Sequence, residues 1–187
     1  MTNKRTALSL MILLCGIWLA SFAASAQQER LQLDHLNRLA GRATEVVEVN
    51  LDQTALRALT KLASLSERDR TKLSETASRL KGVYVRGYEF EREGEYSPDD
   101  IETVRTQLRA PGWARIVQVG GRKGSTDEVY LKQGNGEVDA YTVISTAPKN
   151  ICVINVVGPL KLDEISLLDR EFGISHCGNR GERRRSK

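Results

Sequence analysis

The residues in this chain that could most readily carry out a reaction are a histidine and a cysteine that are adjacent in the sequence. His176 and Cys177 could in principle form a thiolate nucleophile and its base. They lie in a polar stretch near the end of the sequence, where adjacent side chains rarely hold catalytic geometry. The other histidine, His35, has no potential ligand at metal-binding spacing, and neither a CxxC nor an HExxH motif occurs. We therefore assign no catalytic or metal-ligating residue and expect no cofactor.

Two further patterns resemble sites but are better explained by structure. Residues 120–126, GGRKGST, lack the spacing of a phosphate-binding loop and precede a strand pattern, which predicts a basic hairpin loop. Asp99 and Asp100 suit the first turn of a helix, and Asp127 and Glu128 begin a strand. General acid–base catalysis needs carboxyl groups that face each other across a cleft, and neighbours in sequence do not provide this arrangement.

A group of aromatic and basic residues is the best candidate for a binding surface. If Val83, Val129 and Leu131 point into the core, strand alternation places their neighbours on the opposite face. Tyrosine and arginine are favoured at protein interfaces. The pattern predicts an open sheet face that binds a partner protein or an anionic glycan, or else a plain solvated face. Its candidate residues are Tyr84, Arg86, Arg115, Tyr130, Lys132 and Tyr141.

These residues are positioned by a central unit, residues 82–119, which reads as strand, turn, helix and strand. Ser97 can cap the helix, Pro98 fits its first position, and Asp100 stands at capping-box spacing. The residues Pro111-Gly112 end it. An apolar stripe at helical spacing is formed by Ile101, Val104 and Leu108.

The first strand of this unit changes phase. Its apolar residues shift from Val83 and Val85 to Tyr88 and Phe90. A strand keeps one face buried through such a switch only if an extra residue is inserted, so we predict a β-bulge at or near Gly87. The alternative is a strand that frays after Gly87.

The rest of the pattern predicts an α+β fold: a single domain with a mostly antiparallel sheet of about six strands and helices packed on it. A helix is expected at residues 31–43, with Leu36, Leu39 and Ala40 inward, followed by a strand at 44–50. Two helices follow, capped at Asp52 and Ser66, the first with Leu56 and Leu59 inward. Strands at 127–133 and 137–145 flank the hairpin signal Asn135-Gly136, and a turn occupies residues 148–150. A final helix is expected from Asp163 to Gly173, with Ile165, Leu168 and Phe172 inward.

Residues 151–157, ICVINVV, are apolar at nearly every position. Two-sided apolarity is typical of an interior strand that is covered on both faces. Gly158-Pro159 should end this strand. The alternative is an interface between copies of the chain, which would make the protein a homo-oligomer.

The N-terminus predicts export. A basic start at Lys4 and Arg5, an apolar run and the A-x-A site at residues 24–26 form a signal peptide, residues 1–26. An uncleaved membrane anchor is the alternative, and lipidation at Cys15 is disfavoured because no small residue precedes it. Residues 27–174 then form the α+β domain, which would be periplasmic or associated with the cell envelope.

The charge and the cysteines refine this interpretation. Loss of Lys4 and Arg5 changes the net charge from +4 to +4 − 2 = +2. The basic excess lies in residues 175–187, a tail expected to be solvated and disordered, with weak attraction to a membrane surface and not to nucleic acid. In an oxidising compartment Cys152 and Cys177 could form a disulfide, although a buried free thiol at Cys152 is equally ordinary.

Two segments also carry a resemblance. Residues 88–117, YEFEREGEYSPDDIETVRTQLRAPGWARIV, and residues 151–174, ICVINVVGPLKLDEISLLDREFGI, resemble the bacterial "domain of unknown function 4252" family, and the likeness extends over residues 31–174. The resemblance implies an exported envelope protein with a small α+β domain, and many relatives look like lipoproteins. It transfers no catalytic or ligand residue.

Together these observations favour a non-enzymatic, exported bacterial envelope module that binds a protein partner. The alternative is an envelope hydrolase or transferase whose active site is assembled from residues far apart in the sequence.

Overall fold

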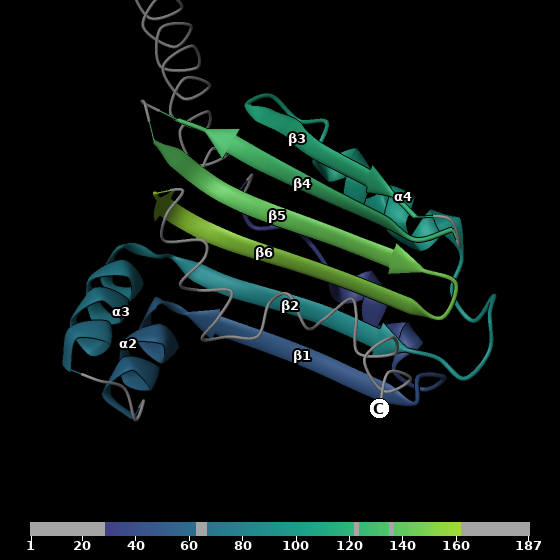
Figure 1. The fold of residues 1–187 in the computed structure, drawn as a ribbon, viewed down its shortest axis with the longest axis horizontal. Helices are drawn as coiled ribbons and strands as arrows, with labels where there is room; N and C mark the ends of the chain where they lie inside the picture. The colour runs from purple at the N-terminus through teal and green to yellow at the C-terminus, as the bar shows by residue number, and fades with distance from the viewer. Residues whose placement is uncertain (1–28, 63–66, 122–123, 135–136, 162–187) are drawn as a thin grey trace, which may run out of the picture.

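The computed structural model of the chain describes residues 29–62, 67–121, 124–134 and 137–161 (Figure 1). In this part of the chain six strands form one antiparallel sheet in the order β1-β2-β6-β5-β4-β3, and helices pack on it. The predicted α+β class and the single domain are confirmed.

The chain forms one half of the sheet with β1 and β2, then the other half with β3, β4 and β5, and joins the two halves with β6. In chain order they are the 3₁₀ helix η1 (Asp34–Leu39), β1 (Glu45–Asp52), α2 (Gln53–Leu62), α3 (Glu67–Arg79), β2 (Gly82–Glu89), α4 (Pro98–Gln107), β3 (Trp113–Gly120), β4 (Thr126–Gln133), β5 (Val138–Ala147) and β6 (Asn150–Leu160). The last strand, β6, lies at the centre of the sheet, between β2 and β5. β1 and β3 are the two edge strands.

The two faces of the sheet carry separate hydrophobic cores. We call the face under η1 and α4 the α4 face; its core includes Tyr88, Phe90 and Ile144. We call the other the α2–α3 face; its core includes Val85 and Ile154, packed with residues of α2 and α3. In Figure 1, η1 and α4 lie behind the sheet, and α2 and α3 lie at its left end.

The predicted β-bulge at Gly87 is wrong. β2 pairs in unbroken register from Gly82 to Glu89 with β1 on one side, and with β6 on the other. Both faces of β2 are covered, so Val83 and Val85 enter one core while Tyr88 enters the other. The apolar residues of β2 move from odd to even positions because both faces of this strand are buried. The strand therefore needs no extra residue.

The N-terminal segment also differs from its prediction. Only Asp34–Leu39 is helical, as a 3₁₀ helix, and Ala40 is exposed. The preceding residues run along the sheet, where the Leu31 backbone N–H donates to Asn155 Oδ1 at 3.0 Å. Leu31 and Leu33 are therefore buried together with Leu36 and Leu39. In α2, Leu56 is buried as predicted but Leu59 is exposed.

The predicted capping residues and end of helix α4 are confirmed. The Ser97 backbone N–H donates to Asp100 Oδ2 at 2.8 Å, which is half of a capping box. The three residues of the predicted stripe, Ile101, Val104 and Leu108, are buried. Gly112 has φ 90°, a left-handed conformation that lets the chain turn directly into β3. Asp52 likewise caps α2, since its Oδ1 accepts from the Ala55 N–H at 2.8 Å.

β6 is the predicted interior strand, buried on both faces along most of its length. It continues to Leu160 and does not end at Gly158. This glycine has φ 127°, and a Cβ there would lie 2.7 Å from the Leu80 Cα, so only glycine fits the approach of the α3–β2 connection.

Several predictions fall partly or wholly outside the described residues. The signal peptide, the cap Ser66, the turn residues Asn135-Gly136, the helix from Asp163 to Gly173 and the basic tail belong to this group. Residues flanking the β4–β5 turn do pair, with the Gly134 N–H donating to Glu137 O at 3.1 Å. Among the helices that are described, none is long and apolar enough to cross a membrane.

Candidate functional site

The strand register divides the six predicted binding residues between the two faces. Facing residues in the paired strands place Arg115 beside Tyr130, and Lys132 two positions further along β4, on the α4 face. Tyr84 and Arg86 of β2 share that face. Tyr141 does not, since it packs against the core of the α2–α3 face.

The prediction that this face is open is wrong, because η1 and α4 cover it. Arg86 is buried, and its guanidinium donates to Asn37 Oδ1 and Asn50 Oδ1, both at 3.0 Å, and forms an ion pair with Glu48 at 3.1 Å. The Arg30 guanidinium lies 4.2 Å from the centre of the Tyr84 ring, a cation–π contact. These side chains hold the N-terminal segment and β1 onto the sheet.

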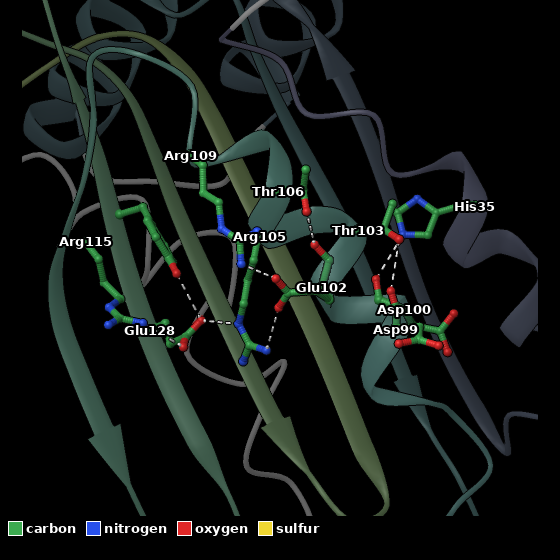
Figure 2. Close-up of polar contacts among 11 residues, drawn as sticks. His35, Asp99, Asp100, Glu102, Thr103, Arg105, Thr106, Arg109, Arg115 and Glu128 are labelled. Atoms are coloured by element: carbon green, nitrogen blue, oxygen red, sulfur yellow. Dashed lines mark hydrogen bonds and ion pairs between the residues drawn. The ribbon is translucent and has the colours of Figure 1, made fainter.

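A network of charged residues joins α4 to β3 and β4 (Figure 2). At its centre is Glu128, whose side chain is 2% exposed. Arg105 Nε donates to Glu128 Oε2 at 2.9 Å, Arg115 donates to Oε1 at 3.4 Å, and the Tyr130 hydroxyl donates to Oε2 at 3.3 Å. Three donors from three elements therefore converge on one buried carboxylate.

The network continues along α4 to the protein surface. Glu102 forms ion pairs with Arg105, at 3.7 Å, and with Arg109. We call Glu102, Arg105, Arg109, Arg115 and Glu128 the Arg–Glu cluster. Three guanidinium groups face two carboxylates, which leaves one positive charge in excess. The side chains of Arg109 and Arg115 are 68% and 46% exposed, so this excess charge is presented to solvent.

Burial and charge within the network change two pKa values. Burial of the Tyr130 hydroxyl raises its pKa above 10.0, and the negative charge of Glu128 raises it further, against the opposing effect of Arg115. Burial lowers the pKa of Arg105, but the hydrogen bond and the charge of Glu128 outweigh that effect and raise it. Arg105 therefore stays charged at any physiological pH.

A second buried carboxylate ties η1 to the start of α4. Asp100 accepts from the Ser97 backbone N–H and forms an ion pair with Arg38, and the His35 ring lies 3.1 Å, Nε2 to O, from the Asp100 carbonyl. His35, which has no potential metal ligand at suitable spacing in the sequence, thus lies at the η1–α4 contact (Figure 2).

The edge strand β3 lies directly beside the Arg–Glu cluster and is apolar. Of the five exposed large hydrophobic residues in the described part of the chain, β3 carries three: Ile116, Val117 and Val119. The β3–β4 register shifts between Arg115 and Val117, so Ile116 is an extra residue in the ladder. β3 therefore combines exposed apolar side chains with a sheet edge that no described strand pairs.

The chemistry of these groups favours recognition. The Glu128 carboxylate is engaged by three donors, and the outward guanidinium groups of the Arg–Glu cluster can form hydrogen-bonded ion pairs with carboxylates of another molecule. Within the described residues, no group of three side chains could hold a metal ion. A shallow hollow of about 390 Å³ lies away from the cluster, on α3, lined by Thr71, Ser74, Glu75 and Ser78.

Cys152 forms a disulfide, as the sequence allowed. Its partner lies outside the described residues, so the predicted pairing with Cys177 stays a prediction.

Sequence reasoning missed both the Arg–Glu cluster and the apolar edge. Glu128 has the same strand parity as Tyr130, which was a signal that both point to the same face. For Arg105 the sequence gives no comparable signal, because its partner Glu128 is 23 residues away.

Comparison with known proteins gives a family. The model of the family described as Domain of unknown function (DUF4252) matches residues 41–168. The chain belongs to this family. The match spans every strand of the sheet and all of α4, so the Arg–Glu cluster and the β3 edge both lie inside the DUF4252 region. No curated protein matches the chain.

Proposed function

We propose that this DUF4252 chain is an exported, non-enzymatic binding module of the cell envelope that takes an extended segment of a partner protein against the open edge of β3. The carrying observation is the concentration of exposed apolar side chains on this one edge strand. A bound strand would complete the β3 ladder with its own backbone, a mode of recognition in which the main chain supplies affinity and alternate side chains supply specificity.

The other edge strand shows how an edge is normally protected. β1 carries the exposed acidic residues Glu45, Glu48 and Asp52, and charged side chains oppose pairing with a second strand. β3 has a single charged residue, Arg115. An edge without such protection supports a role in docking.

The surroundings of β3 define the chemistry of its partner. On the α2–α3 face, Val117 and Val119 would lie beside the added strand, and on the α4 face its neighbour would be Arg115. A segment that alternates apolar and acidic side chains would match both, because its acidic residues would meet the excess positive charge of the Arg–Glu cluster.

Export rests on two supports. Residues 1–26 have the pattern of a signal peptide, and the disulfide at Cys152 fits an oxidising compartment. Sequencing the N-terminus of the protein from a periplasmic fraction should give Gln27 as the first residue. Recovery from the cytosol with Met1 retained would contradict export.

The binding role is tested with a pair of edge variants. Val117 and Val46 are 41% and 43% exposed and lie on opposite edge strands. We expect Val117→Lys to abolish capture of the partner from intact envelopes, because a lysine opposes strand pairing at that edge, while Val46→Lys retains it. The measurement is quantitative mass spectrometry of proteins cross-linked to each variant.

Three outcomes would contradict the proposal. Equal capture by both variants would place the binding site elsewhere. Loss of a homodimer in Val117→Lys, seen by light scattering, would make the occupant a second copy of the chain. Turnover of an envelope substrate by both variants would favour an enzyme.

A further inference from the structure

The β-bulge at Ile116 changes which backbone groups of β3 point outward from the sheet. Just before β3, the Gln133 N–H donates to Gly112 O at 3.1 Å. In an antiparallel ladder every second residue directs both its N–H and its C=O at the partner strand. Gly112 and Ala114 therefore face β4 with their backbone groups, and the backbone groups of Arg115 point away from β4.

Beyond the bulge the opposite parity faces β4. The Gly121 N–H donates to Ser125 O at 2.8 Å, so the odd-numbered residues from there back to Val117 direct their backbone groups at β4. The backbone groups of Gln118 and Gly120 consequently point away from it.

The outward backbone groups on the two sides of the bulge are out of step. Those of Arg115 and Gln118 are three residues apart, whereas a regular strand offers its groups at every second residue and cannot pair with both. The part before the bulge is restricted further, because the Trp113 N–H donates to Ala110 O at 3.3 Å. The longest stretch that a regular strand can pair is therefore residues 117–120.

We propose that the bulge restricts docking on β3 to residues 117–120, which we call the docking window, so that the occupant is a short extended segment of a partner protein. This inference rests on the proposed docking at β3 and specifies its length and register. Gln118 and Gly120 provide the backbone hydrogen bonds. The bulge also prevents β3 from pairing along its whole length with a second copy of the chain, since natural sheets use bulges to limit such pairing at their edges.

The docking window sets the side chains of the partner segment. Its residues beside Val117 and Val119 lie on the α2–α3 face, where apolar side chains fit. Its residue opposite Gln118 lies on the α4 face, where Arg115 is the next side chain along β3. An acidic residue fits at that position, because its carboxylate meets the excess positive charge of the Arg–Glu cluster. The expected motif is apolar, acidic, apolar.

A backbone substitution tests the docking window. Gln118→Pro removes an N–H that points away from β4, so the ladder with β4 is kept. The probe is a fluorescein-labelled peptide in which valine and glutamate alternate, and fluorescence anisotropy measures its binding. We expect Gln118→Pro to bind roughly tenfold more weakly than Gln118→Leu, which changes the same side chain but retains the N–H. Urea denaturation checks that both variants fold.

The matched substitution on the other side of the bulge is Arg115→Pro, which should weaken binding no more than Arg115→Ala does. A larger loss in Arg115→Pro would show that the ladder crosses the bulge and would overturn the docking window. Equal binding by Gln118→Pro and Gln118→Leu would also overturn it. Docking at β3 itself would stand if Val117→Lys still lost the peptide, and would fall if Val117→Lys bound it as well as the unaltered chain. Absence of binding by the unaltered chain would overturn the expected motif.

Deletion of Ile116 tests the limit on length. It leaves Arg115 opposite Tyr130 and Val117 opposite Val129, and it gives the outward backbone groups an even spacing of two residues. An apolar edge of this regular kind pairs readily with a second copy. We expect the deletion variant to self-associate in light scattering more than the unaltered chain, and Val117→Lys in the deletion variant to reverse this. A deletion variant that associates no more than the unaltered chain, or whose association Val117→Lys does not reverse, would refute the proposal.

Discussion

The two faces of the sheet are made by alternate residues of the same strands and both carry an apolar core, yet on one of them buried polar bonds supplement the packing. On the α4 face, Asn155, Arg86 and Glu128 are buried and bonded to named partners in the segments above them. On the α2–α3 face, Ile154 and Val156 belong to an apolar core that reaches a disulfide at Cys152. Directed polar bonds fix where a cover lies, whereas an apolar face accepts any cover of suitable shape.

Asn155 shows how this specification works in the middle of an apolar strand. It is fully buried between Ile154 and Val156, and its amide donates to Glu29 O at 3.2 Å and to Thr142 Oγ1 at 3.1 Å. Its Oδ1 accepts from the Leu31 N–H. A buried amide without partners is costly, so the N-terminal segment is required to pass over this one position.

The largest expected effect tests whether the two faces are equally well packed. Ile144→Ala on the α4 face and Ile154→Ala on the α2–α3 face remove side chains that are buried to the same degree, so each should lower the free energy of unfolding by about 2–5 kcal/mol. Urea denaturation measures both. Val46→Ala, at an exposed site, is the control and should cost less than about 0.5 kcal/mol. A much smaller loss for Ile154→Ala would show that the α2–α3 face is loosely covered.

An intermediate effect tests the polar bonds of the α4 face. Glu128→Gln keeps the shape of the side chain but removes the charge that Arg105 and Arg115 share, so unfolding should become easier by about 1–3 kcal/mol. The neighbouring Asp127→Asn, which lies exposed on the other face, should change stability by less than about 0.5 kcal/mol. Equal effects of the two variants in urea denaturation would show that the Arg–Glu cluster contributes nothing specific.

The smallest effect is a change in the free energy of unfolding at alkaline pH, which arises from buried tyrosines on the α4 face. Burial raises the pKa values of Tyr88, Tyr96 and Tyr130 above 10.0 in the folded protein. Between the unfolded and the folded pKa the folded state binds more protons, so the stabilisation is complete below pH 10 and is lost as pH rises through the folded values. Tyr130→Phe should make stability fall less steeply above pH 10, and Glu128→Gln should lower the pKa of Tyr130.

Both alkaline expectations are measurable in the same protein. Urea denaturation at a series of pH values gives the slope, and tyrosinate absorbance gives the pKa of Tyr130 by difference from Tyr130→Phe. A slope that Tyr130→Phe leaves unchanged would show that this hydroxyl does not contribute.

The parts of the fold that the sequence predicted correctly have local signals. Helix α4 is predicted by Ser97, Asp100 and Gly112, which lie within one short segment, and β6 is predicted by its continuous apolar run. The error at Gly87 came from assuming that only one face of β2 is buried. Coverage of a second face depends on the rest of the chain, and no local pattern in β2 contains it.

The candidate site was harder to predict for a related reason. Arg86 meets Asn37 and Asn50, which lie 49 and 36 residues away, and these pairs exist only because the strand order brings them together. Tyr84, Arg86 and Tyr130 were correctly placed on one face by alternation. Whether that face is open or closed is decided by η1 and α4, whose docking no strand pattern reveals.

The position of β6 has a consequence for how the molecule is made. β1 and β2 can pair with each other, and so can β3, β4 and β5, but the two groups share no ladder until β6 is inserted between them. Because this strand is synthesised after the other five, the emerging polypeptide reaches residue 160 before its sheet can close. Long-range strand pairing is slow. The two partial sheets therefore stay unjoined until the last strand has been made.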